Sequence, residues 1–356
     1  MTKNSTYISN SVTYFTHPGA GYLRITGPDR VGFIQRQSTN DVRLLTPKRS
    51  VTTVLTNPAA RILDVLQLIV DGEDTIGAIP LPGRAAATAS FLKRRIFFTD
   101  KVTVTDASDE ITQIDLDGVA AADLLHANGI DPPPLNGTTT GKWAGIDLRV
   151  IGQRGLTGMG YRILTPAEPV LSGNRLGSGD RLGSGDRLGS HIEGRGEPLI
   201  ERLGNAGVGA LSPADYEILR VEVGLPGAAE LSEDYTPLET NLDAAISANK
   251  GCYTGQEVIA RQITYDKITR RMVGLRLGAP VVSGARLMAD GKPAGTVTSP
   301  VMSPRLGPVA LAIINRPHHQ PGTEVIVQTG TDGIRGRVVA LPFPASSPLP
   351  IPPSKR

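Results

Sequence analysis

Residues 22–35 read YLRITGPDRVGFIQ, and this stretch sets the fold class of the chain. Within it, residues 22–26 alternate as a half-buried strand does, and a Gly-Pro pair then turns the chain. Asp29 is a favourable helix N-cap, and Val31 and Ile34 follow it at near-helical spacing. A strand that leads through a tight turn directly into a helix predicts mixed α and β structure.

The same mixture continues outward from this stretch. Strand patterns cover residues 51–55, 62–70 and 76–79, a helix pattern covers 84–95, and alternation returns at Val102 and Val104. A second unit begins near residue 111, with a helix pattern at 118–128 and strand patterns at 148–151 and 161–164. Because short turns join the strands, the sequence predicts α+β domains rather than a doubly wound sheet.

The C-terminal third of the chain has a different pattern. Residues 212–215, Ser-Pro-Ala-Asp, are a helix start with an N-cap, a first-turn proline and an acid. Six short strand patterns then lie between Gly and Pro turns, at residues 272–277, 285–288, 295–298, 309–314, 325–328 and 335–339. They predict a small closed or nearly closed barrel.

We therefore predict an N-terminal α+β domain over residues 5–110, a second over 111–268 and the barrel over 269–342, with segment exchange between the first two left open. Residues 175–190 repeat the hexapeptide RLGSGD, and Gly and Ser without apolar anchors cannot offset the entropy of ordering. This predicts a disordered insertion over 173–196. The proline-rich residues 343–356 predict a disordered tail.

Composition limits the function classes. With 37 basic and 34 acidic side chains, the net charge of +3 is too small to indicate nucleic acid as a direct partner. The single cysteine, Cys252, cannot form an internal disulfide or a four-cysteine metal site, and the five histidines show no metal-ligand spacing. The N-terminus lacks an apolar signal core, and the longest apolar run, 309–314, is too short to span a membrane. We expect a soluble cytoplasmic monomer.

The most informative stretch is KGCYTGQE at residues 250–257, which holds the sole thiol. Its Thr-x-x-Glu spacing matches a capping box and predicts a helix that starts just after Cys252. A helix N-terminus and the nearby Lys250 both favour the thiolate form of a cysteine. Gly251 and Gly255 would let the backbone approach a ligand closely. Two interpretations stay open: a reactive thiol, or a small buried apolar side chain.

KGCYTGQE resembles the signature of the YgfZ family, within the glycine cleavage T-protein superfamily. Residues 23–35 resemble the family's opening strand, turn and helix. RVEVGLP at 220–226 resembles an R-x-E-x-G-x-P stretch shared with the T-protein. YTPLETNL at 235–242 resembles the P-x-x-x-N-L motif that precedes the cysteine motif in the family. The similarity covers most of residues 20–340. It implies two α+β domains and a C-terminal barrel around a folate-sized site, with tetrahydrofolate bound and iron–sulfur client proteins supported, including enzymes that modify tRNA.

The resemblance also implies site residues. Cys252 would be the reactive group and Lys250 would tune it. Arg220 would hold the glutamate tail or ring carbonyl of the folate, although an ion pair with Glu217 or Glu222 is a simpler role for it. The other residues implied at the folate site are Glu222, Asn241, Gly251, Tyr253, Gly255, Gln256 and Glu257.

The chain departs from the T-protein pattern at two acids. The G-G-x-x-D-D pattern reads ARILDV here, so that Asp64 is kept and Val65 replaces the second acid. In the G-x-T-G-E segment, Met159 replaces a folate-contacting glutamate. Aminomethyl transfer needs a carboxylate near the folate nitrogen. We therefore predict a folate-binding accessory protein for iron–sulfur cluster assembly or repair, with a folate-dependent aminomethyltransferase as the alternative.

Overall fold

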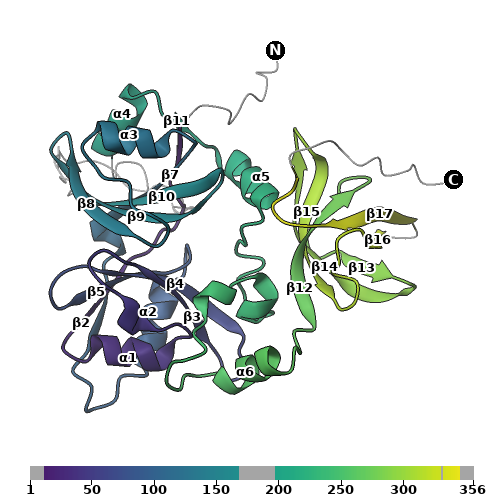
Figure 1. Ribbon diagram of the computed structural model, residues 1–356, viewed down its shortest axis with the longest axis horizontal. Coiled ribbons are helices and arrows are strands. Elements are labelled where there is room, and N and C mark those ends of the chain that lie inside the picture. The colour runs from purple at the N-terminus through teal and green to yellow at the C-terminus, as the bar shows by residue number, and fades with distance from the viewer. Residues whose placement is uncertain (1–11, 168–196, 330–331, 345–356) are drawn as a thin grey trace, which may run out of the picture.

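The computed structural model describes residues 12–167, 197–329 and 332–344, which form three lobes (Figure 1). Two α+β domains lie against each other, and a β-barrel stands beside them at the end of a connecting segment. The predicted α+β class with a C-terminal barrel is confirmed. The predicted disordered insertion lies outside the described residues, as does the predicted tail from residue 345 onward.

The first domain is a five-stranded antiparallel sheet with two α-helices and one short 3₁₀ helix. Its strand order is β3 (Val51–Thr56), β4 (Ile62–Val70), β5 (Thr75–Ile79), β2 (Leu23–Thr26) and β6 (Thr103–Asp106), and its helices are α1 (Arg30–Gln37), η1 (Val42–Leu44) and α2 (Ala85–Lys93). Asp29 stands at the N-cap of α1, but its carboxylate accepts the N–H of Lys101, at 2.9 Å, instead of capping the helix. The helix start is thereby tied to the residues that lead into β6.

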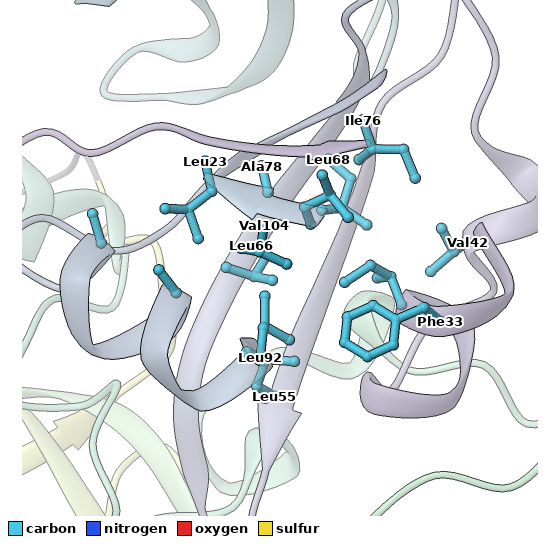
Figure 2. Packing of buried hydrophobic residues seen from close by; sticks show 14 residues of the cluster. Leu23, Phe33, Val42, Leu55, Leu66, Leu68, Ile76, Ala78, Leu92 and Val104 are labelled. Atoms are coloured by element: carbon cyan, nitrogen blue, oxygen red, sulfur yellow. The ribbon is translucent and has the colours of Figure 1, made fainter. Parts of the chain in front are cut away.

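Both helices pack on one face of this sheet (Figure 2). Leu23 and Leu66 come from the sheet, Phe33 from α1 and Leu92 from α2, and each of these side chains is 0% exposed. Burial of such a side chain contributes about 1.5–3 kcal/mol. The opposite face of the sheet is left to meet the second domain.

The second domain is built on a six-stranded sheet. Its order is β11 (Gly209–Ala210), β1 (Thr13–Phe15), β7 (Ile111–Asp117), β10 (Gly158–Pro166), β9 (Ile146–Gly155) and β8 (Thr138–Trp143), with η2 (Ser108–Glu110), α3 (Ala121–Ala127) and α4 (Glu197–Asn205). The predicted assignment of residues 13–15 to the first domain is wrong. β1 lies between β7 and β11, where both of its edges find hydrogen-bonding partners.

A connecting segment leads from this sheet to the barrel. α5 (Pro213–Val223) begins at Ser212, whose hydroxyl accepts the N–H of Asp215 as predicted, and ends at the left-handed Gly224. The segment continues through η3 (Pro237–Thr240), η4 (Asp243–Ala245) and α6 (Gln256–Thr264).

The six predicted C-terminal strands close into a barrel. Its order is β12 (Arg270–Leu277), β15 (Gly307–Asn315), β14 (Lys292–Ser303), β13 (Arg286–Ala289), β16 (Glu324–Thr329) and β17 (Asp332–Val339), and β17 pairs again with β12. Phe343, predicted to lie in the disordered tail, is buried against the outside of the barrel, and its N–H donates to the carbonyl of Glu222. Among the described helices, none is long and apolar enough to cross a bilayer.

Candidate functional site

A central cavity of about 1220 Å³ lies where the two α+β domains meet the connecting segment. This is larger than a common small-molecule site, about 300–1,000 Å³. Its lining includes side chains of β4 (Val65, Gln67), β7 (Gln113, Asp115, Asp117), β10 (Arg162) and α5 (Tyr216, Arg220), together with His17 and Asn241. The cavity therefore collects polar groups from segments that are far apart in the sequence.

Strand β7 supplies one polar wall of this cavity. Gln113, Asp115 and Asp117 all line it, whereas Ile114 and Leu116 fill the core of the second domain. Successive side chains of a strand point to opposite faces, so one strand serves both the core and the cavity. This wall was not predicted from the sequence, although polar residues at every second position of 113–117 are the signal that could have indicated it.

Asp115 is held by an arginine and a histidine. It accepts hydrogen bonds from Arg162 at 2.8 and 2.9 Å and from His17 Nε2 at 2.7 Å. Burial alone would raise the pKa of Asp115, but the attraction of Arg162 and His17 outweighs it and holds the pKa well below its usual range. His17 also packs edge-on against Tyr216, which itself stacks on Phe15 at 4.0 Å. This cluster joins β1, β7, β10 and α5.

Asp117 lies one step further along the same wall and is only 4% exposed. Its Oδ1 accepts the N–H of Leu156 at 2.7 Å. Burial, and then the charge of Asp115, raise the pKa of Asp117 to about 7. A carboxyl group that faces a cavity and titrates near neutral pH is a candidate functional group.

The retained acid of the T-protein-like pattern points away from the cavity. Asp64 is 1% exposed and accepts the N–H groups of Val65 and Leu81, at 2.8 and 3.1 Å, and the hydroxyl of Thr88. Val65, which replaces the second acid, lines the cavity. At the position of the second acid, the cavity is therefore lined by the apolar side chain of Val65.

Arg220 lines the cavity, but its guanidinium is used inside the protein. It is 5% exposed and donates to Glu217, to the carbonyl of Leu225 at 2.8 Å and to Ser299 Oγ at 2.8 Å, and it lies 3.4 Å from Glu230. These partners join α5 to β14 of the barrel. The ion pair with Glu217 foreseen as the simpler role is present, and the pair with Glu222 is not among Arg220's hydrogen bonds.

The other predicted residues of the R-x-E and P-x-x-x-N-L stretches also make structural contacts. Glu222 is 7% exposed, does not line the cavity, and binds Ser303 and Arg305, the latter at 2.7 Å. Asn241 does line the cavity, where it takes a left-handed conformation at φ 61° and donates to the carbonyl of Met272 at 3.1 Å.

The KGCYTGQE loop anchors the connecting segment to the first domain. The ammonium of Lys250 donates to the backbone carbonyls of Gln35 at 2.6 Å, of Ser38, and of Asn40 at 3.0 Å. These carbonyls lie at and after the C-terminal end of α1, where helix carbonyls lack partners within the helix. Lys250 therefore supports the first domain, and its expected role of tuning the thiol has no counterpart among these contacts.

The predicted capping box does not form. α6 starts after Gly255, which takes φ 84° at the N-cap, and no side chain caps the helix. A side chain at Gly255 would place its Cβ 2.8 Å from the carbonyl of Asn57 and 2.9 Å from Cα of Ala60. Glycine is needed at this position because the loop packs tightly on the turn between β3 and β4. Gly255 therefore contacts protein backbone rather than a ligand.

The remaining motif residues lie around this anchor. Tyr253 is buried beside Ala60, Gln256 is half-buried at the first turn of α6, and Glu257 is exposed and pairs with Arg261 at 2.6 Å. Gly251 and Cys252 are exposed, and neither lines the central cavity. Cys252 therefore lies outside the cavity that Arg220 lines, because the loop packs with its thiol on the outer surface. The thiol is also not a buried apolar group.

Within the described residues, no group of three or more His, Cys, Asp or Glu side chains is placed to hold a metal ion.

Comparison with known proteins gives a consistent picture. Residues 270–344 match the glycine cleavage T-protein C-terminal barrel domain. A chloroplastic protein of Arabidopsis thaliana named as a transferase is 29% identical over 280 residues, which cover 78% of this chain and 59% of that protein's own length. An aminomethyltransferase of Bacillus subtilis (strain 168) is 27% identical over 333 residues, covering 91% of this chain and 85% of that protein.

Among solved structures, the fold matches a glycine cleavage system aminomethyltransferase T from Bartonella henselae. The TM-score is 0.76 at 24% sequence identity, and the match covers 94% of this chain and 87% of the other.

Proposed function

Because the chain has the fold of the glycine cleavage T-protein and carries that protein's C-terminal barrel domain, we propose that its central cavity binds a reduced folate for one-carbon transfer. The observation that carries this proposal is the cavity of about 1220 Å³ between the two α+β domains, lined by amides and carboxyl groups. The curated relatives named as aminomethyltransferases favour transfer chemistry over binding alone.

The wall of the cavity suits a pterin ring. Such a ring presents hydrogen-bond donors and acceptors side by side on one edge, and Gln67, Gln113 and Asp117 offer both kinds of group. Gln113 is held in place, since its Nε2 donates to the carbonyl of Gly21 at 2.6 Å. A few polar groups fixed in this way orient a ligand within an otherwise apolar pocket.

Exposed arginines of the same cavity suit the glutamate tail of a folate. Arg49, Arg84 and Arg154 are exposed and line the cavity. Arg154 donates to the carbonyl of Val223 at 3.0 Å and Arg84 to that of Leu63 at 2.5 Å, and neither guanidinium forms an ion pair with a carboxylate of the described residues. A guanidinium binds carboxylates in a bidentate manner, which favours an anionic tail here.

A calorimetric titration with tetrahydrofolate tests the proposal. We expect saturable binding by the wild type and a loss of about tenfold or more in Val65→Tyr, whose side chain would fill part of the cavity. The matched control is Val282→Tyr, since Val282 is 71% exposed and outside the cavity. Absence of binding by the wild type, or equal binding by Val65→Tyr, would overturn it. Turnover of an aminomethyl-loaded lipoyl carrier with tetrahydrofolate then tests transfer.

A second candidate function is support of iron–sulfur proteins, as the YgfZ-like motif implies. The observation that favours it is the exposure of Cys252 on a loop that is firmly anchored through Lys250 and Gly255. Because the thiol lies outside the cavity, it would meet a client protein directly. In a deletion strain, iron–sulfur enzyme activities should recover with the wild-type gene and not with Cys252→Ser; full rescue by Cys252→Ser would remove the thiol from this function.

A further inference from the structure

Asp117 differs from its neighbour on the cavity wall in lacking a countercharge of its own. Asp115 is bound by both Arg162 and His17. The carboxyl group of Asp117, in contrast, accepts the backbone N–H of Leu156 through Oδ1, and the described residues supply its side chain with no further hydrogen bond. Its Oδ2 is therefore the oxygen that remains for a molecule in the cavity.

The β9–β10 hairpin is shaped around this carboxyl group. A Cβ at Gly155 would lie 1.9 Å from Oδ1 of Asp117, and one at Gly160 would lie 2.6 Å from it. Gly155 of β9 pairs with Gly158 of β10 at the hairpin turn, and Gly160 of β10 pairs with Asp117 of the neighbouring strand β7. Because only glycine fits at both positions, the hairpin closes over one side of the carboxyl group and fixes its direction.

The charged and titratable groups around Asp117 come from four elements. They are Asp115 on β7, Arg162 on β10, His17 beyond β1 and Tyr216 on α5. Burial and Asp115 favour the neutral acid, whereas the Leu156 N–H, Arg162 and His17 favour the carboxylate. Asp115 uses hydrogen bonds of both Arg162 and His17, so Asp117 stays the less compensated of the two acids.

We propose that Asp117 is the proton-exchanging group of the central cavity and that, as the neutral acid, it donates an Oδ2–H hydrogen bond to an acceptor nitrogen or oxygen of the bound heterocycle. The proposal deepens the proposed function and rests on it. It assigns a carboxyl group to the ligand from the second domain, on the wall formed by β7, while the first domain presents Val65.

A consequence is that binding takes up a proton. A ligand that accepts from the acid stabilises its neutral form, so affinity should fall as the pH rises past about 7. Above that pH, each further unit should weaken binding by about tenfold, because one proton must be recovered. An asparagine at this position would keep an oxygen for the Leu156 N–H and offer its NH₂ to the ligand at every pH.

The experiment is calorimetric titration of the full chain with tetrahydrofolate between pH 6 and 8.5, in two buffers of different ionisation enthalpy. We expect proton uptake and the pH-dependent loss of affinity in the wild type, and affinity that is nearly constant in Asp117→Asn. Asp106→Asn, an exposed carboxyl group at the end of β6 and outside the cavity, is the matched control and should behave as the wild type does.

The outcomes separate the two proposals. If the wild type binds tetrahydrofolate without proton uptake, or if Asp117→Asn keeps the wild-type pH profile, the role of Asp117 is refuted and folate binding stands. If the wild type binds no tetrahydrofolate, the proposed function fails. Infrared titration of the ligand-free protein then still tests the carboxyl group: a carboxylic C=O band with a midpoint near pH 7 should be present in the wild type and absent in Asp117→Asn. Its absence from the wild type overturns the inference.

Discussion

Replacing Asp117 by asparagine is expected to make the protein more stable at pH 8 than the wild type. The pKa of Asp117 rises from 3.8 to about 7 on folding, chiefly because the group is buried and secondly because Asp115 lies beside it. Between these two pH values the unfolded chain has lost the proton while the folded chain keeps it. Stability from this group is therefore present below pH 3.8 and is lost as the pH rises towards 7.

The size of the effect follows from the same values. Each pKa unit corresponds to about 1.4 kcal/mol, so Asp117 lowers the free energy of unfolding by about 4 kcal/mol at pH 8 and by roughly 1–2 kcal/mol at pH 5. Asparagine avoids this cost because it is neutral and can still accept the N–H of Leu156. The gain of the variant should grow between pH 5 and 7 and level off above 7.

The assay is urea denaturation followed by the fluorescence of Trp143. This is the single tryptophan of the chain, and it is 4% exposed in the core of the second domain. Asp117 belongs to the same domain and lies on its cavity wall. Asp106→Asn, which replaces an exposed carboxyl group outside the cavity, serves as the matched control. A variant that is no more stable than the wild type at pH 8, or a gain that does not vary with pH, would refute the reasoning.

Three further substitutions test the other contacts. Lys250→Met removes the ammonium that donates to three carbonyls and should lower the free energy of unfolding by about 2–3 kcal/mol. The rate of Cys252 alkylation should stay unchanged. A large change in that rate with unaltered stability would support the role of Lys250 in tuning the thiol. Arg220→Ala leaves Glu230, whose side chain is 0% exposed, without its cation and should cost about 3–5 kcal/mol, with Arg220→Lys intermediate; thermal unfolding that matches the wild type would contradict this. Val65→Asp returns a carboxylate to the first-domain wall and should raise aminomethyl transfer at least about tenfold, whereas an unchanged rate would show that the acid at this position does not limit transfer.

The regular elements were predictable because their signals are local. Ser212 caps α5 as expected, since the capping hydroxyl and the N–H that it accepts are three residues apart. All six barrel strands were found from alternation between turn residues. Residues 13–15 were assigned to the first domain, because a segment of three residues does not by itself indicate which sheet it joins.

The candidate site was predicted less well, because a sequence motif identifies residues but not the residues that they contact in the fold. Lys250 was expected to act on the thiol two residues away, yet its ammonium binds carbonyls more than two hundred positions earlier in the chain. Thr254 and Glu257 have the spacing of a capping box, yet the close packing of Gly255 on the first domain moves the helix start by one residue.

By itself, the sequence determined the α+β and barrel architecture, because backbone hydrogen bonding imposes periods of 2 and 3.6 residues that each segment displays alone. The tertiary structure decided which strand faces line a cavity. Asp117 of β7 and Val65 of β4 line the same cavity only because their two sheets pack together around the connecting segment. It also left Cys252 on the surface. Exposure and pKa depend on neighbours brought from distant parts of the chain, and no local pattern specifies those neighbours.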